Sequence, residues 1–129
     1  MAWAMRYVIE LPPVTKKNSQ RIATNKATGK RFILPSESYK VYEAGARWFL
    51  RPAPDKPLTG PLNVKCLFYM PTRRAVDLNN LLEAATDALV HWGIIKDDNS
   101  RVVASHDGSR VLYDKEHPRT EITITEAEG

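Results

Sequence analysis

VDLNNLLEAATDALVHWGIIKDDNS, residues 76–100, is the stretch that decides both the expected fold and the expected chemistry. Its apolar residues recur at helical spacing, which predicts an amphipathic helix from Leu78 to Trp92 with one buried stripe. Asp77 before that helix is a good N-cap, and Gly93 after it suits the position that ends a helix. The apolar pair Ile94-Ile95 then indicates a short return to the core. That return could bring the next residues back beside the start of the helix or the end of the strand before it.

Carboxylates gather on this predicted helix and just after it. They are Asp77, Glu83, Asp87, Asp97 and Asp98. Oxygen ligands of this kind suit a hard cation such as Mg²⁺. Each residue also has an ordinary structural interpretation, as a helix cap, a solvated helix face or a polar turn. Their coincidence within one short block favours a metal-dependent site.

The order of these residues resembles the RusA-type Holliday-junction resolvases, small endonucleases found largely in prophages. The resemblance rests on Asp77-Leu78-Asn79-Asn80-Leu81, Asp87-Ala88-Leu89, Gly93 and Asp97-Asp98, and more weakly on residues 12–19, PPVTKKNS. It therefore covers most of the chain. It implies a homodimer that cuts four-way DNA junctions with Mg²⁺, for which Mn²⁺ can substitute, and with no small-molecule cofactor.

Two positions depart from the pattern of that family. The second aspartate of the family motif falls at Asn79, and a lysine that the family often carries one turn later falls at Glu83. Positions 79 and 83 share a helix face, so either the carboxylate has moved one turn along or this chain binds junctions and cuts them poorly. We expect an active enzyme, because an Asn oxygen can still coordinate Mg²⁺. The expected catalytic residues are Asp77, Asn79, Glu83, Asp87 and Asp98, and the expected metal ligands are Asp77, Glu83, Asp97 and Asp98.

Charge is distributed unevenly along the 129 residues. The net charge is +4, but residues 1–56 carry +7 and residues 57–129 carry −3. Basic residues in one half and carboxylates in the other are expected if one part of the protein follows DNA phosphates while another holds a metal. The expected DNA-binding residues are Lys16, Lys17, Asn18, Arg21, Lys30, Arg31, Arg73 and Arg74. Solubilising charges, a solvated turn at the two last arginines and an Asx turn at Asn18 are the ordinary alternatives.

The remaining composition narrows the protein class. A single cysteine, Cys66, excludes an intrachain disulfide and a cysteine-based zinc cluster, and it fits a reducing cytoplasm. No stretch approaches the roughly 18 apolar residues of a membrane span, and the N-terminus lacks the order of a secretory signal. We therefore expect a cytoplasmic protein without a membrane partner.

The expected fold is α/β (α+β), one RusA-like domain over residues 1–129 with two main helices packed on a mixed sheet. The predicted elements are strands at 6–11, 63–70, 101–110 and 119–125, a basic loop or hairpin at 16–33, and helices at 36–49, with Ser36 as cap, and 78–92.

These observations together predict a metal-dependent, structure-selective endodeoxyribonuclease of recombination and repair. A dimer would place two sites on opposing strands of a four-way junction, so that paired nicks resolve it. The alternatives are a junction-binding protein that keeps the fold without cutting, and an unrelated small α/β protein whose acidic helix is only a surface.

Overall fold

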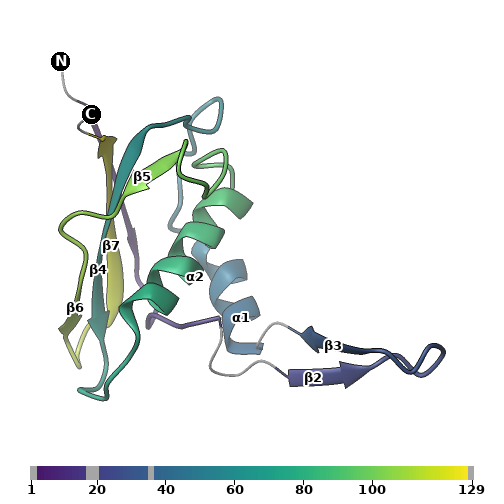
Figure 1. The fold of residues 1–129 in the computed structure, drawn as a ribbon. Coiled ribbons are helices and arrows are strands. Elements are labelled where there is room, and N and C mark those ends of the chain that lie inside the picture. The colour runs from purple at the N-terminus through teal and green to yellow at the C-terminus, as the bar shows by residue number, and fades with distance from the viewer. Residues whose placement is uncertain (1–2, 17–20, 35–36, 128–129) are drawn as a thin grey trace.

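The computed structural model describes residues 3–16, 21–34 and 37–127. Its framework is a mixed sheet with both helices, α1 (Glu37–Ala46) and α2 (Leu78–His91), on one face (Figure 1). The strands of this sheet are β1 (Ala4–Ile9), β4 (Leu62–Met70), β5 (Val103–Ser105), β6 (Arg110–Tyr113) and β7 (Arg119–Glu126). The fold class predicted from the sequence, α+β with two helices on a mixed sheet, is confirmed.

Strand β7 lies at the centre of the sheet, antiparallel to β1 on one side and to β4 on the other. Along β4 the buried residues alternate, with Leu62, Val64, Cys66 and Phe68 all at most 1% exposed. Side chains on alternate positions of a strand point to the same face, so this face is the one that the helices cover. Cys66 is a buried thiol in this strand, and burial raises its pKa to about 12.

The predicted strand at 101–110 is wrong as a single element. The structure has two short strands, β5 and β6, and each pairs in parallel with a different part of β4. A turn separates them, and its Gly108 has a φ of +87°. From the neighbouring strand β4, the Asn63 Oδ1 accepts hydrogen bonds from Ser105 Oγ at 2.5 Å and from Asp107 N at 2.8 Å. The Asn63 side chain thus stabilises the turn between β5 and β6. A local hydropathy pattern cannot predict this turn, because its partner lies in another strand.

Helix α2 buries one apolar face against the sheet. Its residues Leu81, Ala85, Ala88 and Leu89 are at most 1% exposed, as the amphipathic pattern predicts. The helix ends at His91, and Gly93 follows its C-cap, Trp92, with a φ of +77° that favours glycine. The return to the core that follows is also confirmed, because Ile94 and Ile95 are buried and the main chain there bonds to both backbone groups of Leu58, at 2.9 Å each.

Helix α1 runs beside α2 in the same direction (Figure 1), and the Trp92 Nε1 joins the two by donating to the Glu43 main-chain oxygen at 2.7 Å. The helix ends at Ala46 and not at Phe49 as predicted, because Trp48 N and Phe49 N bond to the oxygens three residues earlier, those of Gly45 and Ala46, and not four. The predicted cap, Ser36, lies outside the described residues.

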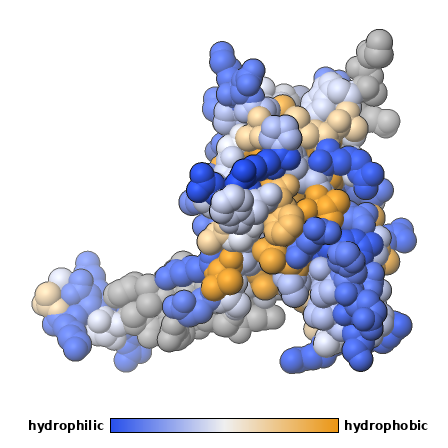
Figure 2. Space-filling view, turned by 180° about the vertical axis from the view of Figure 1, so that it is seen from behind, coloured by the Kyte–Doolittle hydropathy of each residue, from blue (hydrophilic) through white to orange (hydrophobic). Residues whose placement is uncertain are grey.

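A separate two-stranded sheet, β2 (Arg21–Thr24) paired with β3 (Arg31–Leu34), projects from the domain as a hairpin (Figure 1). In its turn the Asn25 Oδ1 accepts from Ala27 N at 2.9 Å, and Gly29 has a φ of +72°. Of the two predicted possibilities, loop or hairpin, the hairpin is correct. Figure 2 shows hydrophilic residues at its far end and hydrophobic side chains gathered near its base. In the described part of the chain, neither helix has the length and apolar character needed to cross a membrane.

Candidate functional site

Asp77 begins α2 as an N-cap, as the sequence predicts. Its backbone is extended, with φ −82° and ψ 115°, and its Oδ1 accepts hydrogen bonds from Asn79 N at 2.8 Å and Asn80 N at 3.3 Å. These bonds satisfy two of the amide hydrogens that have no partner within the helix. Both use the same oxygen, so Oδ2 is not engaged in the cap. The side chain of Asn79 is exposed to solvent.

A cleft of about 530 Å³ lies between α1 and the later half of α2. We call it the acidic cleft. It is lined by Lys16, Tyr39, Lys40, Glu43, Asp87, Val90, His91 and Asp98. Lys16 comes from the segment after β1, the next three residues from α1, and Asp98 from the loop after α2, so four parts of the chain converge here.

Lys16 and Asp87 form the closest ion pair in this cleft. Lys16 Nζ lies 2.5 Å from Asp87 Oδ2, and the two side chains are 29% and 23% exposed. The hydrogen bond to Asp87 raises the pKa of Lys16, and the charges of Glu83 and Glu43 raise it further. The ammonium therefore stays charged and neutralises part of the negative charge of its surroundings. The prediction that Lys16 binds DNA stays untested.

The α1 wall of the acidic cleft was not foreseen in the sequence. Tyr39 Oη donates to Glu43 Oε2 at 2.5 Å, and Glu43 Oε1 lies 3.8 Å from His91 Nδ1. Burial raises the pKa of Tyr39, and the hydrogen bond to Glu43 raises it further. Tyr39 and Glu43 are four residues apart on one helix face, which was the only local signal that they act together.

The Asp97–Asp98 pair divides into two roles. Asp97 holds the loop, because its Oδ1 accepts from Asp98 N at 2.7 Å and its Oδ2 accepts from Asn99 Nδ2 at 3.1 Å. These bonds, that from Asp98 N foremost, lower the pKa of Asp97. Asp98 faces the cleft, and its pKa is raised, first by a hydrogen bond shared with Asp97, then by burial and the charge of Asp87.

The structure thus brings Asp98 to Asp87, in the later half of α2. The sequence had suggested the start of the helix or the end of the strand before it. Asp77 lies about 15 Å before Asp87 along the axis, at about 1.5 Å per residue. Glu83 lies one turn before Asp87, partly buried, and its charge acts on Lys16.

The fit of these residues to Mg²⁺ rests on Asp87 and Asp98. Among the described residues no group of three or more His, Cys, Asp or Glu side chains could hold a metal ion. Mg²⁺ is commonly held by one or two carboxylates, and takes water and substrate phosphate oxygens as its other ligands. Two carboxylates that face one open cleft meet this requirement.

Two arginines precede Asp77 in the loop that leaves β4. The Arg73 guanidinium carbon lies 4.1 Å from the centroid of the Tyr113 ring, which is itself 38% exposed. This cation–π contact holds the Arg73 side chain near the start of α2. Both Arg73 and Arg74 are exposed, as phosphate-binding residues must be.

The other predicted DNA-binding residues belong to the hairpin and to the segment before it. Lys30 and Arg31 are exposed on the hairpin. Arg21 lies in β2, but its side chain is outside the described residues, as are Lys17 and Asn18 altogether.

Comparison with known proteins shows the family to which the chain belongs. No curated protein matches the chain. Residues 10–125 match the family model of endodeoxyribonuclease RusA. The matched range covers nearly the whole chain, and it includes α2, both walls of the acidic cleft and the hairpin. The chain therefore belongs to the RusA endodeoxyribonuclease family of Holliday-junction resolvases, as the motif around α2 predicted.

Proposed function

We propose that the protein is a Mg²⁺-dependent endonuclease that resolves four-way DNA junctions by paired nicks. The observation that carries this proposal is the approach of Asp98 to Asp87 in an open cleft, beside the ammonium of Lys16. Membership of a nuclease family gives the reaction class, and this cleft supplies carboxylates where a phosphodiester can reach them.

Asp98 and Asp87 are the residues that would hold Mg²⁺ in the acidic cleft. A bound Mg²⁺ supplies a water of lowered pKa and stabilises the charge that develops on the phosphate. Lys16 fixes the orientation of the Asp87 carboxylate through their 2.5 Å contact. It also offsets the repulsion between the cleft carboxylates and a DNA phosphate, which falls with distance as Coulomb's law requires.

Asp77 has a second proposed role beside its cap. It stands at the first aspartate of the family motif, and the cap engages only its Oδ1. We propose that its carboxylate is required for cutting, with Glu83 in place of the family's second aspartate and Asn79 as a neutral oxygen donor. The distance of about 15 Å from Asp87 makes Asp77 the residue whose role most needs a direct test.

The proposed path of the DNA arms runs over the basic surfaces beside the cleft. Lys26, Lys30 and Arg31 are exposed on the hairpin, and Arg73 and Arg74 are exposed at the start of α2. Arginine binds phosphate through two parallel hydrogen bonds, and lysine binds it as a compact charge. The hairpin projects from the domain (Figure 1), and we propose that it contacts an arm of the junction outside the cleft.

Paired nicks need two sites, so we propose a homodimer. An apolar hollow of about 380 Å³ between the start of α1 and the segment after β1 supports this proposal. It is lined by Leu11, Pro12, Val14, Glu37, Ser38, Val41 and Tyr42. Val41 is 72% exposed, and contact with a second copy would remove this apolar surface from water.

The test compares a synthetic four-way junction with a linear duplex of the same sequence, in Mg²⁺ and in EDTA. We expect symmetric nicks in the junction only, and only with Mg²⁺. Tight junction binding without nicks in Mg²⁺ or Mn²⁺ would favour the non-cutting alternative. Absence of DNA binding in low salt would contradict both and leave α2 as an acidic surface.

A further inference from the structure

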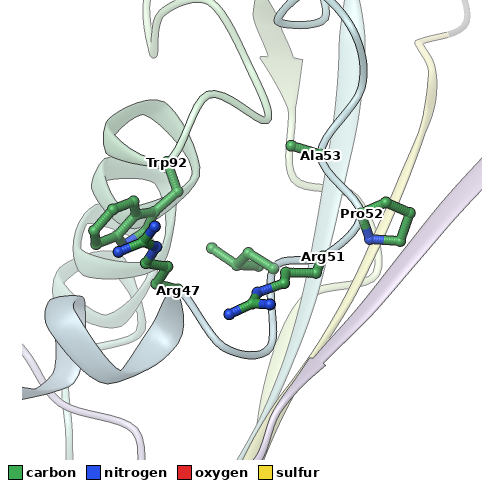
Figure 3. Close-up of a pocket in the computed structure, with 6 residues that line it drawn as sticks. Arg47, Arg51, Pro52, Ala53 and Trp92 are labelled. Carbon is green, nitrogen blue, oxygen red and sulfur yellow. The ribbon is translucent and has the colours of Figure 1, made fainter.

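A second cleft lies at the C-terminal ends of α1 and α2, and its chemistry is opposite to that of the acidic cleft. It has a volume of about 500 Å³ and is lined by Arg47, Leu50, Arg51, Pro52, Ala53 and Trp92 (Figure 3). We call it the arginine cleft. Figure 3 shows Arg47 against the Trp92 ring and Arg51 extending from the neighbouring loop into the same pocket.

Each arginine of this cleft stacks on a tryptophan. The Arg47 guanidinium carbon lies 5.5 Å from the centroid of the Trp92 ring, and that of Arg51 lies 4.4 Å from the Trp48 ring. A guanidinium over an indole face is attracted by the ring electrons. The contact holds both cations in place before any ligand arrives.

Among the described residues, no carboxylate forms an ion pair with either arginine. Arg119 provides the contrast: it stacks on Tyr69 at 3.8 Å, but it also bonds Asp114 at 2.9 Å and Glu121 at 2.8 Å. The charge of Arg119 is therefore neutralised by carboxylates of the fold, whereas the positive charge of the arginine cleft remains available to an anion.

Trp48 adds an aromatic ring that is largely open to solvent beside its contact with Arg51. It is 67% exposed, so it does not fill the core of the domain. A positive groove beside an exposed aromatic ring is the combination by which proteins bind single-stranded nucleic acid, since every base can stack on the ring while arginines hold the backbone.

The arginine cleft adjoins the acidic cleft through one residue. Glu43 contributes its carboxylate to the acidic cleft, and its main-chain oxygen accepts from the indole of Trp92, which lines the arginine cleft. A DNA strand that enters the acidic cleft would therefore continue over Arg47 and Arg51.

We propose that the arginine cleft and Trp48 bind an unpaired stretch of DNA next to the branch point. Arg47 and Arg51 hold its phosphates, and one base stacks on Trp48. This inference rests on the proposed function for the presence of DNA in the acidic cleft, but the binding it describes needs neither metal nor cutting.

The experiment measures binding of a labelled oligothymidylate and of a linear duplex in EDTA, which separates binding from cutting. We expect Trp48→Ala to weaken oligothymidylate binding at least about fivefold and to leave duplex binding unchanged. Trp48→Phe keeps an aromatic face and should bind close to wild type. Thermal unfolding of each variant shows that the fold is retained.

The arginines are tested through salt. The double change Arg47→Gln with Arg51→Gln should lower the slope of log K against log salt for the oligothymidylate by about 1.4, or about 0.7 for each phosphate contact on a single strand. Lys115→Gln, an exposed cation on the turn between β6 and β7, should leave that slope unchanged.

The outcomes distinguish this inference from the proposed function. Equal oligothymidylate affinity in wild type, Trp48→Ala and the double arginine variant overturns the inference, even if the protein cuts junctions. Loss of oligothymidylate binding in these variants, in a protein that binds junctions but does not cut them in Mg²⁺ or Mn²⁺, supports the inference and overturns the proposed cutting.

Discussion

The two ends of α2 carry the same residue type in different surroundings. At its start, Asp77 is exposed and bonds to the amide hydrogens of its own helix. In the later half, Asp87 is 23% exposed, pairs with a lysine far away in the sequence and faces Asp98. Position within the motif therefore does not determine the role of an aspartate. The neighbours that the tertiary structure brings to it do.

Replacement of Asp98 by Asn should have the largest effect. It keeps the shape of the side chain and removes the charge that faces the acidic cleft. We expect junction cutting to fall by at least about 100-fold, because loss of even an outer partner of a metal site costs about 10- to 100-fold. Junction binding should stay equal or become tighter, since less negative charge repels the phosphates.

The matched control for Asp98 is Asp55→Asn, an exposed aspartate in the loop between α1 and β4. Single-turnover nicking rates and binding in EDTA give the two readouts. Cutting by Asp98→Asn at the rate of Asp55→Asn would place the metal elsewhere.

Asp77 can be tested by two replacements that separate its cap from its charge. Asn is as good an N-cap as Asp, whereas Ala lowers the free energy of unfolding by about 1 kcal/mol. We expect Asp77→Asn to unfold like wild type and yet to lose cutting, and Asp77→Ala to lose both stability and cutting. Denaturant unfolding and nicking rates measure the two effects.

If Asp77→Asn is both stable and fully active, Asp77 is only a cap. The Asp77 carboxylate would then have no part in the reaction, and the acidic cleft in the later half of α2 would remain as the proposed site.

The sequence could predict what depends on neighbours along the chain. The amphipathic pattern gave α2, Asp77 and Gly93 gave its two ends, and Ile94-Ile95 gave the return to the core. Each of these follows from interactions within about one or two helical turns, where spacing and residue type suffice.

The acidic cleft could not be predicted in the same way, because its partners are distant in sequence. Lys16 and Asp87 are 71 residues apart, and Glu43 reaches α2 only because α1 runs parallel to it. The break between β5 and β6 has the same cause, a side chain of β4. Family resemblance named aspartates, but only the fold shows which of them meet.

Glu83→Gln should have an intermediate effect. Glu83 lies one turn before Asp87, is partly buried, and its charge raises the pKa of Lys16. We propose that it replaces the carboxylate that the family carries at position 79, so its loss should lower cutting about as much as Asp77→Asn does. Glu83→Lys should inactivate the enzyme by placing a cation beside Lys16.

The double change Asn79→Asp with Glu83→Lys restores the family pattern and should stay active. Nicking rates of these three variants on one junction decide the matter. A fully active Glu83→Gln variant would leave Asn79 or a water as the third oxygen donor.

The smallest expected effect is on the salt dependence of junction binding, and it comes from basic residues of the acidic cleft and of the hairpin. Lys16 already has a partner in Asp87 at 2.5 Å, whereas Lys26, Lys30 and Arg31 are exposed on the hairpin. Counterion release counts only cations that meet phosphates. Replacing these three hairpin residues with Gln should therefore lower the salt slope of junction binding by about 2–3, while Lys16→Met should change it by less than one. A larger change in slope for Lys16→Met than for the hairpin variant would mean that Lys16 leaves Asp87 when DNA binds, and that the acidic cleft itself contacts the backbone through this lysine.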